Sequence, residues 1–326
     1  MQKQYTKRCT LRDGDSLLNR KLLQKIGVVT QKIAEQLFTM DTGDRIPTIQ
    51  EFSEEFQSAR GTVQTALASL QDEKAVELVA RGHLGTYIAS VDHLKLLKAA
   101  GFKTMVGVMP LPYSKKYEGL ATGICSALEQ NGVSTALAFM RGSDNRLRGL
   151  LDGRYDFAVI SQLTAQYYID RGENIIIVEN LGKFSYVGKH VLLLRENDPC
   201  RKSGRFSGYK VGIDTSSVDQ KTLTLSYFEG KKVEYVPLFY NQIVPFLRVG
   251  KIDAAVWNLD DIDLAGNRLC YRLLDGRQLN IIDTEAAVIC RKNDRLVYHI
   301  LKRMMDCQKV LDYQKDVLSG KIMPIY

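Results

Sequence analysis

The sequence has few cysteines and histidines, and none of them lies in a metal-binding pattern. The 326 residues include six cysteines and four histidines, with no Cys-x-x-Cys pair and no histidine spacing typical of zinc sites. We therefore expect free thiols, no structural metal and no cofactor. The widely separated cysteines are Cys9, Cys125, Cys200, Cys270, Cys290 and Cys307.

Long apolar runs are also absent. No stretch reaches the roughly 18 apolar residues of a membrane span, and the N-terminal sequence MQKQYTKRCTLRDGDS lacks the apolar segment of a signal peptide. Apolar residues nevertheless make up 45% of the chain, which is close to the average of globular proteins. We expect a cytoplasmic protein with enough apolar material for two or three domains.

The net charge of +8 is unevenly distributed along the chain. Residues 1–92 carry 12 basic and 12 acidic side chains, whereas residues 93–326 carry 33 basic and 25 acidic ones. Within the first part, residues 1–34 hold eight basic residues against Asp13 and Asp15. This distribution predicts a basic N-terminal arm on an otherwise balanced domain, and such an arm suits contacts to phosphate.

Apolar residues between positions 16 and 40 recur at steps of three and four, which is typical of amphipathic helices. Gly27 and Thr30 separate two apolar runs, and Thr30 is a suitable helix N-cap. The pattern therefore predicts two short helices.

The next segment predicts a winged helix. A helix over 48–56 and a second helix over 59–73 are separated by a tight turn, with apolar side chains on one face of the second. The sequences AVELVA (75–80) and TYIAS (86–90) then predict two strands around RGHLG, a glycine-bounded tip. Helix, turn, helix and a two-stranded wing define residues 1–90 as a DNA-binding domain with a basic arm.

Three spaced blocks of this domain resemble the GntR family of bacterial regulators. The family pattern runs roughly G-D-R-L-P-S, then T-V-x-x-A-L-x-x-L, then R-x-G-x-G-T-Y. The resemblance covers residues 28–90 and implies DNA binding by a winged helix-turn-helix. The matching residues are Gly43, Asp44, Arg45, Ile46 and Pro47; Arg60, Thr62, Val63, Ala66, Leu67 and Leu70; and Arg81, Gly85, Thr86 and Tyr87.

The second helix of such a domain lies in the major groove, and the wing touches the backbone or the minor groove. Gln50 and Gln64 stand where the family often has arginine. Glutamine can bind adenine through two hydrogen bonds, so we expect an A·T-rich operator unless both side chains are merely solvated. The predicted DNA-binding residues are Thr48, Gln50, Arg60, Thr62, Gln64, Arg81, His83 and Gly85.

After a predicted linker helix at 91–102, the chain repeats one local pattern. LLDGRYDFAVIS (150–161) and LRVGKIDAAVWN (247–258) share a helix end, a glycine turn, a buried strand and a polar tip. Each is the third strand of an alternation of strands and helices. The repeat therefore predicts two α/β lobes.

Each lobe is followed by a similar apolar strand, in GKHVLLLREND (188–198) and TEAAVICRKND (284–294). We interpret these strands as crossings from one lobe into the other, which gives two hinges. The predicted domain spans 103–326, with lobe 1 at about 103–187 and 288–326 and lobe 2 at about 193–283.

This topology resembles the type II periplasmic-binding-protein fold, which LysR-type regulators also use as an effector domain. With the winged helix in front, the chain resembles YhfZ-type regulators. The resemblance implies a small ligand between the lobes, where open α/β lobes bind ligands beyond the carboxyl ends of their strands. The predicted ligand-binding residues are Leu111, Tyr113, Ser114, Ser143, Ser161, Lys189, His190, Thr215, Ser216, Ser217, Tyr240, Asn241, Trp257, Asn258 and Thr284.

Two features of this set have alternative interpretations. DTSSVD (214–219) places three hydroxyls before a helix, which suits an anionic ligand or simple N-capping. We favour an anion, although Tyr113, Tyr240 and Asn258 would also suit a sugar or an amide. Trp257, the only tryptophan, either forms a wall of the cleft or fills the core, and its place in the strand favours the core.

Catalysis is the competing class of function, because some enzymes use the same two-lobed fold. Asp156 and Asp253 form a matched pair, but both precede their strands, at the end opposite the cleft. His190 is the one candidate acid or base, and a lone histidine more often contacts a ligand. We therefore expect no enzyme.

The sequence as a whole predicts a ligand-responsive, DNA-binding transcriptional regulator that acts as a homodimer. A single winged helix makes few base contacts, and two-fold pairing doubles them. The alternative is a sensor or an enzyme that uses the winged helix for dimerisation.

Overall fold

The computed structural model describes residues 13–260, 262–274 and 279–326 and divides into two compact units, Met1–Lys103 and Thr104–Tyr326. Residues 1–12, which carry four of the eight basic residues behind the predicted arm, lie outside the described residues. Within the described ranges, no helix is long and apolar enough to cross a membrane.

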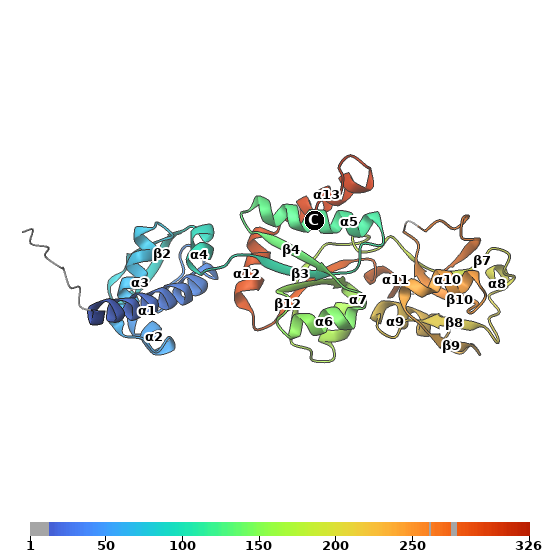
Figure 1. Cartoon of the computed structure of the whole chain (residues 1–326), viewed down its shortest axis with the longest axis horizontal. Helices are drawn as coiled ribbons and strands as arrows, with labels where there is room; N and C mark the ends of the chain where they lie inside the picture. The colour runs from blue at the N-terminus through green and yellow to red at the C-terminus, as the bar shows by residue number, and fades with distance from the viewer. Residues whose placement is uncertain (1–12, 261, 275–278) are drawn as a thin grey trace, which may run out of the picture. The chain divides into compact units, whose positions relative to one another are not determined.

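The first unit is a winged helix (Figure 1). Its helices bury one apolar face each, and the wing is an antiparallel hairpin that pairs Ala80 with Thr86. The elements are α1 (Asp13–Phe38), α2 (Ile49–Glu55), α3 (Arg60–Asp72), β1 (Val76–Ala80), the 3₁₀ turn η1 (Gly82–Leu84), β2 (Thr86–Val91) and α4 (His93–Ala99). The predicted helix-turn-helix and wing are confirmed.

The prediction of two short helices before this motif is wrong, because α1 is one helix of 26 residues. The Thr30 hydroxyl does not cap a new helix but donates to the Ile26 carbonyl at 2.9 Å, one turn earlier. Gly27 is exposed and continues the helix, since a glycine inside a helix costs only about 1 kcal/mol relative to alanine. Burial of Ile33 and Leu37 outweighs that cost.

The predicted linker segment contains α4, which packs within the first unit. Leu96 and Leu97 are buried, and α4 contacts α1. Asp92 caps the helix by accepting the Lys95 N–H. Only a few residues therefore connect α4 to the second unit, which begins at Thr104.

The second unit contains two five-stranded sheets, one in each lobe. The first has the strand order β4-β3-β5-β12-β6 and the second the order β11-β7-β10-β8-β9. The strands are β3 (Met105–Met109), β4 (Thr135–Phe139), β5 (Phe157–Ser161), β6 (Ile175–Asn180), β7 (His190–Arg195), β8 (Lys210–Ile213), β9 (Glu234–Pro237), β10 (Ala254–Asn258), β11 (Leu269–Leu273) and β12 (Ala286–Arg291).

Helices cover the faces of these sheets. In the first lobe α13 lies along α5 (Figure 1), and the close approach requires Gly123, whose Cβ would lie 2.4 Å from the Val310 carbonyl oxygen. The helices are α5 (Lys115–Gln130), α6 (Ser143–Leu151), α7 (Gln162–Ile169), α8 (Cys200–Ser203), α9 (Val218–Tyr227), the 3₁₀ turn η2 (Tyr240–Gln242), α10 (Ile243–Arg248), α11 (Leu279–Ile282), α12 (Arg295–Met304) and α13 (Cys307–Leu318).

The two apolar strands that follow the lobes do cross into the opposite sheet. β7 pairs antiparallel with β10 in the second lobe, and β12 pairs antiparallel with β5 in the first. An arginine ends each crossing strand and binds the turn of the repeated segment: Arg195 donates to the Ile252 carbonyl at 2.8 Å, and Arg291 to the Tyr155 carbonyl at 2.7 Å.

The repeated aspartates have the same structural role in both lobes. The Asp156 carboxylate accepts the Val106 N–H at 2.7 Å, and the Asp253 carboxylate accepts the Lys210 N–H at 2.9 Å. Each carboxylate thus joins the turn before one strand (β5 or β10) to the start of the neighbouring strand (β3 or β8). The repeated sequence therefore encodes the same hydrogen bond between strands in both lobes.

A ring-over-glycine contact holds the centre of the first sheet. The fully buried Phe157 packs on Gly107 of β3, where an added Cβ would lie 2.2 Å from Phe157 Cζ. The tight contact leaves no room for any larger residue at position 107.

Gly107→Ala should lower the free energy of unfolding of the second unit by about 1–3 kcal/mol, because overpacking displaces Phe157. Gly27→Ala is the matched control of opposite sign: no atom lies within 4 Å of the added Cβ, so α1 should gain up to about 1 kcal/mol. Urea unfolding of the full chain measures both, and unchanged stability of Gly107→Ala would show that Phe157 moves aside freely.

Candidate functional site

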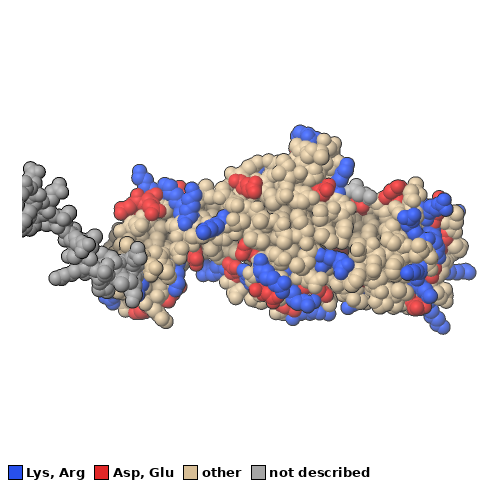
Figure 2. All heavy atoms as spheres, in the orientation of Figure 1, with Lys and Arg blue, Asp and Glu red and all other residues tan. Residues whose placement is uncertain are grey.

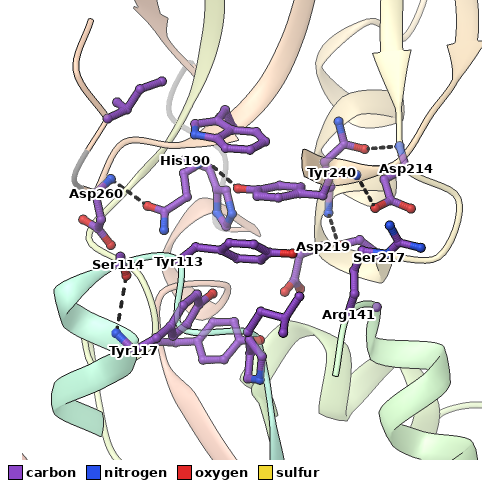
Figure 3. A pocket seen from close by; sticks show the side chains of 18 of the residues that line it. Tyr113, Ser114, Tyr117, Arg141, His190, Asp214, Ser217, Asp219, Tyr240 and Asp260 are labelled. Carbon is purple, nitrogen blue, oxygen red and sulfur yellow. Dashed lines mark hydrogen bonds between the residues drawn. The ribbon is translucent and has the colours of Figure 1, made fainter. Parts of the chain in front are cut away.

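A cavity of about 400 Å³ lies between the two lobes of the second unit (Figure 3). Its walls come from segments after β3, β4, β8 and β10 and from the start of β7. Apart from β7, these are carboxyl ends of strands, where ligands of open α/β sheets bind. Its size is within the range of small-molecule sites.

The structure brings most of the predicted ligand-binding residues to this cavity. Those that line it are Leu111, Tyr113, Ser114, Ser143, His190, Ser217, Tyr240, Trp257 and Asn258. The predicted residues outside the lining are Ser161, Lys189, Thr215, Ser216, Asn241 and Thr284. Their binding roles remain predictions.

Several of the residues outside the lining have structural partners. Ser161 is fully buried and caps α7 by accepting the Thr164 N–H at 3.0 Å. Thr284 is buried and donates to the Ile281 carbonyl at 2.6 Å. Asn241 accepts a 3.5 Å hydrogen bond from Arg141, which does line the cavity.

The segment DTSSVD is used mainly for local hydrogen bonds. Ser216 donates both its N–H and its hydroxyl to Asp214 Oδ1, at 2.9 and 2.6 Å. Ser217 caps α9 by accepting the Gln220 N–H, while Thr215 is exposed. The three hydroxyls therefore do not surround one point, and Asp214 adds a carboxylate beside them.

Aromatic rings from both lobes form one side of the cavity. Trp257 stacks on Tyr240 with a centroid distance of 3.9 Å and an angle of 12°. Tyr240 faces Tyr113 of the first lobe at 6.3 Å, and Figure 3 shows these two rings one above the other. Trp257 also packs partly against the core of the second lobe, so both alternative roles considered for it apply.

Sequence reasoning missed the charged residues of the cavity. The lining includes four aspartates and two arginines, which lie in loops or helix starts and have the appearance of ordinary surface charges in the sequence. The only available signal was their position just after strands. They are Asp214, Asp219, Asp260, Asp263, Arg141 and Arg146.

Asp219 of α9 connects the lobes. Its Oδ1 accepts hydrogen bonds from the Ser161 hydroxyl at 2.6 Å and the Thr164 hydroxyl at 2.9 Å, both in the first lobe. Burial raises the pKa of this carboxyl, and the hydrogen bond from Ser161 only partly opposes the effect. A second contact between the lobes runs from the Val218 N–H to the Ser143 hydroxyl at 3.2 Å.

Arg146 of α6 is a buried cation in the same wall, with 5% of its surface exposed. It donates to the Met140 carbonyl at 2.8 Å and to the Tyr186 hydroxyl at 3.3 Å. Its Nε–H is buried and has no hydrogen-bond acceptor.

His190 and Asp283 form a buried pair at the two crossings. His190 begins β7, Asp283 precedes β12, and His190 Nδ1 is hydrogen bonded to the Asp283 carboxylate. Burial by itself lowers the histidine pKa, but the Asp283 carboxylate outweighs it, so the pKa of His190 is raised. The pair therefore joins both hinges while His190 is charged.

The winged helix presents most of its predicted DNA-binding residues on the surface. Arg60 and Gln64 on α3 are exposed, whereas Thr62 is half-buried. Arg60 donates to Gln50 Oε1 at 2.9 Å, so Gln50 positions the arginine. Thr48 has a structural role, since it forms the capping box of α2 with Glu51.

The wing carries further basic residues. Arg81 lies over the ring of Tyr87 at 4.5 Å, and His83 is exposed in η1. Gly85 has a φ of +101° and contacts the side chain of Arg45, whose Nε would lie 2.6 Å from an added Cβ. Arg45 was not among the predicted DNA-binding residues. Its position beside the wing makes it a further candidate for contact with DNA.

Charges of both signs are interspersed over the face of the molecule shown in Figure 2. The positive net charge therefore forms no single basic face in that view. DNA binding has to be argued from the winged helix and its individual side chains.

The fold and the cavity define a class of protein that joins a helix-turn-helix domain to a two-lobed binding-protein-like domain. A helix-turn-helix domain family matches residues 41–88. The substrate binding protein of an amino acid ABC transporter shares the two-lobed fold at 13% identity, with a TM-score of 0.50 over 67% of this chain and 98% of that one. The predicted type II periplasmic-binding-protein fold is thereby confirmed.

The chain belongs to the YhfZ family, whose C-terminal domain matches residues 92–326. The YhfZ protein of Escherichia coli (strain K12) is 34% identical over 314 residues, which cover 95% of this chain and 100% of that one. The crystal structure of YhfZ from Shigella flexneri has a TM-score of 0.61 at 35% identity and covers 72% of this chain and 97% of that chain. The resemblance to YhfZ proteins is therefore confirmed.

His190→Gln should lower stability most at acidic pH. A histidine whose folded pKa is raised contributes its full stabilisation below its ordinary pKa of 6.5 and loses it as the pH rises through the folded value. Breaking a buried pair costs about 3–5 kcal/mol, so the deficit should approach this value below pH 6.5 and shrink as the pH rises through the raised pKa of His190. Urea unfolding at a series of pH values measures it, with His83→Gln, at an exposed position of η1, as the control. A pH-independent deficit would show that the pair is not ionic.

Proposed function

We propose that this protein is a transcriptional regulator whose binding to DNA responds to a small molecule in the cavity between the lobes. The cavity carries the proposal: it lies at the carboxyl ends of the strands, between lobes joined by two crossing strands, in a chain that also has a helix-turn-helix domain. A DNA-binding regulator of this kind acts in the cytoplasm.

Ligand control requires two states with different ligand affinities. The lobes touch through Asp219 and Ser143, and these contacts lie at the cavity rather than in the sheets. Opening the lobes would break them and leave both sheets intact. A ligand that contacts both walls therefore favours the closed state, and the change can reach the DNA-binding domain.

We further propose that the protein binds DNA as a homodimer. The exposed residues of one α3 offer few base contacts, and two-fold pairing would place two such helices in half-sites about 34–36 Å apart. Sedimentation equilibrium of the free protein and of its complex with DNA tests the stoichiometry.

Arg60→Ala should weaken binding to the operator by about 1–3 kcal/mol, because arginine can bind guanine through two hydrogen bonds. The operator is first selected from random DNA with the intact protein, and fluorescence anisotropy then compares operator and random duplexes. Arg154→Ala, on the exposed surface of the second unit, is the control. Equal losses on both duplexes would contradict base recognition by Arg60 and indicate a phosphate contact.

A low-molecular-mass fraction of cell extract that stabilises the protein should also change its operator affinity by about 5- to 150-fold, the usual range of allosteric coupling. The measurement combines thermal shift with anisotropy, and mass spectrometry identifies the retained compound. A fraction that binds the second unit but leaves operator affinity unchanged would contradict ligand control.

A further inference from the structure

The charges that line the cavity are mostly negative. Four aspartates face two arginines, and the only histidine of the lining, His190, is already paired with the buried Asp283. Arg141 is the more exposed of the two arginines and lies over the ring of Phe239 at 3.9 Å. The described cavity therefore lacks enough positive charge to balance its carboxylates.

Asp219, Asp260 and Asp263 are the lining carboxylates with an oxygen that accepts no hydrogen bond from the described residues, since Asp263 accepts the Gly266 N–H on Oδ1 alone. Asp214 is fully used, because Oδ1 accepts from Ser216 and Oδ2 accepts the Tyr240 N–H at 2.9 Å. Asp219 accepts both of its hydroxyl bonds on Oδ1, and Asp260 accepts the Gly188 N–H on Oδ2. Each of these two carboxylates, like that of Asp263, therefore keeps one oxygen outside these bonds.

The partners of Asp219 are neutral hydroxyls, which bind a carboxylate without neutralising it. Asp219 is about nine-tenths buried, with 9% of its surface exposed, and the nearby charge of His190, which is hydrogen bonded to Asp283, only partly offsets the cost of burying this carboxylate. The raised pKa of Asp219 is consistent with this deficit. A cation in the cavity would remove it.

The aromatic wall favours the same kind of ligand. The faces of tyrosine and tryptophan rings are electron-rich and attract cations. Tyr113 and Tyr240 line the cavity beside Asp219 (Figure 3). The carboxylates and the ring faces of the cavity therefore both favour a positively charged ligand.

Arg146 indicates a second feature of the ligand. It lines the cavity with 5% of its surface exposed, and its hydrogen bonds go to the neutral Met140 carbonyl and Tyr186 hydroxyl. A ligand oxygen against the guanidinium would face a buried cation whose hydrogen-bond partners carry no negative charge.

We propose that the cavity binds a small molecule with a positively charged amine, which pairs with Asp219 or Asp260, and an oxygen acceptor that faces Arg146. The inference rests on the proposed function, because it names the ligand class of the same cavity. Asp219 also holds the lobes together, so an amine at this carboxylate would stabilise the closed state directly.

Matched compounds test the inference with the full chain. Each carbon skeleton is used in three forms: the amino acid, the corresponding amine without carboxylate, and the N-acetylated amino acid without positive charge. Thermal shift followed by titration calorimetry should show binding of an amino acid, weaker binding of its amine, and at least about tenfold weaker binding of the N-acetyl form.

Two variants identify the carboxylate. Asp219→Asn keeps an oxygen that accepts from Ser161 and Thr164, so the lobes should still close, but amine affinity should fall at least about tenfold. Asp260→Asn is the second variant if the first unfolds, and Asp312→Asn, exposed on α13, is the control that should bind normally.

Strongest binding by an uncharged or anionic compound would overturn the inference, as would amine affinity that survives both cavity variants. Either result leaves the proposed function standing, since another ligand can still control DNA binding. Conversely, an amine that binds through Asp219 without changing operator affinity supports the ligand class and contradicts the proposed regulation.

Discussion

The architecture of the second unit depends on the antiparallel insertion of each crossing strand into the sheet of the other lobe. All but the last residue of β7 and of β12 is buried, and each strand has hydrogen-bonded neighbours on both sides. Since a buried strand cannot leave its ladder without losing those bonds, each lobe should move as one body. We expect motion only in the segments that lead into β7 and β12, where the His190–Asp283 hydrogen bond links the start of β7 to the segment before β12.

The repeat explains both the likeness of the lobes and their difference. Its arginine and aspartate anchor strands at the end away from the cavity, in the same way in each lobe. The strand tips differ: Ser161 donates to Asp219 of the other lobe, whereas Asn258 lines the cavity and donates its backbone N–H to the Tyr240 hydroxyl oxygen. The scaffold is thus duplicated, and the chemistry of the site comes from the positions at which the copies diverge.

Much of the fold could be predicted because its signals are local. The period of apolar residues, the glycine at the turn and the doubled strand pattern identified the winged helix and both lobes. The break proposed at Gly27 and Thr30 was wrong because tertiary burial of the following turns outweighs a weak local signal.

The site was less predictable, because its chemistry depends on distant partners. Strand ends correctly indicated where the cavity lies, but Asp219 and Arg146 sit in helices whose local pattern resembles a solvated surface. Ser216 shows the converse. From the sequence, its hydroxyl was predicted to bind an anionic ligand, but in the structure it donates to the carboxylate of Asp214, two residues away. Sequence spacing cannot tell which neighbour a short polar side chain will choose.

The lobe contacts also suggest how sensitive the closed state is to a ligand. A hydrogen bond to a charged group contributes about 1.5–3 kcal/mol, and Asp219 makes two of them between the lobes. Burial of an unbalanced charge costs several kcal/mol and opposes this gain. Because the two contributions are of the same order, a coupling energy of about 1–3 kcal/mol is enough to shift the equilibrium. A single cation beside Asp219 can therefore shift the equilibrium between open and closed lobes. A ligand that does not neutralise Asp219 can favour the closed state only through contacts with other residues.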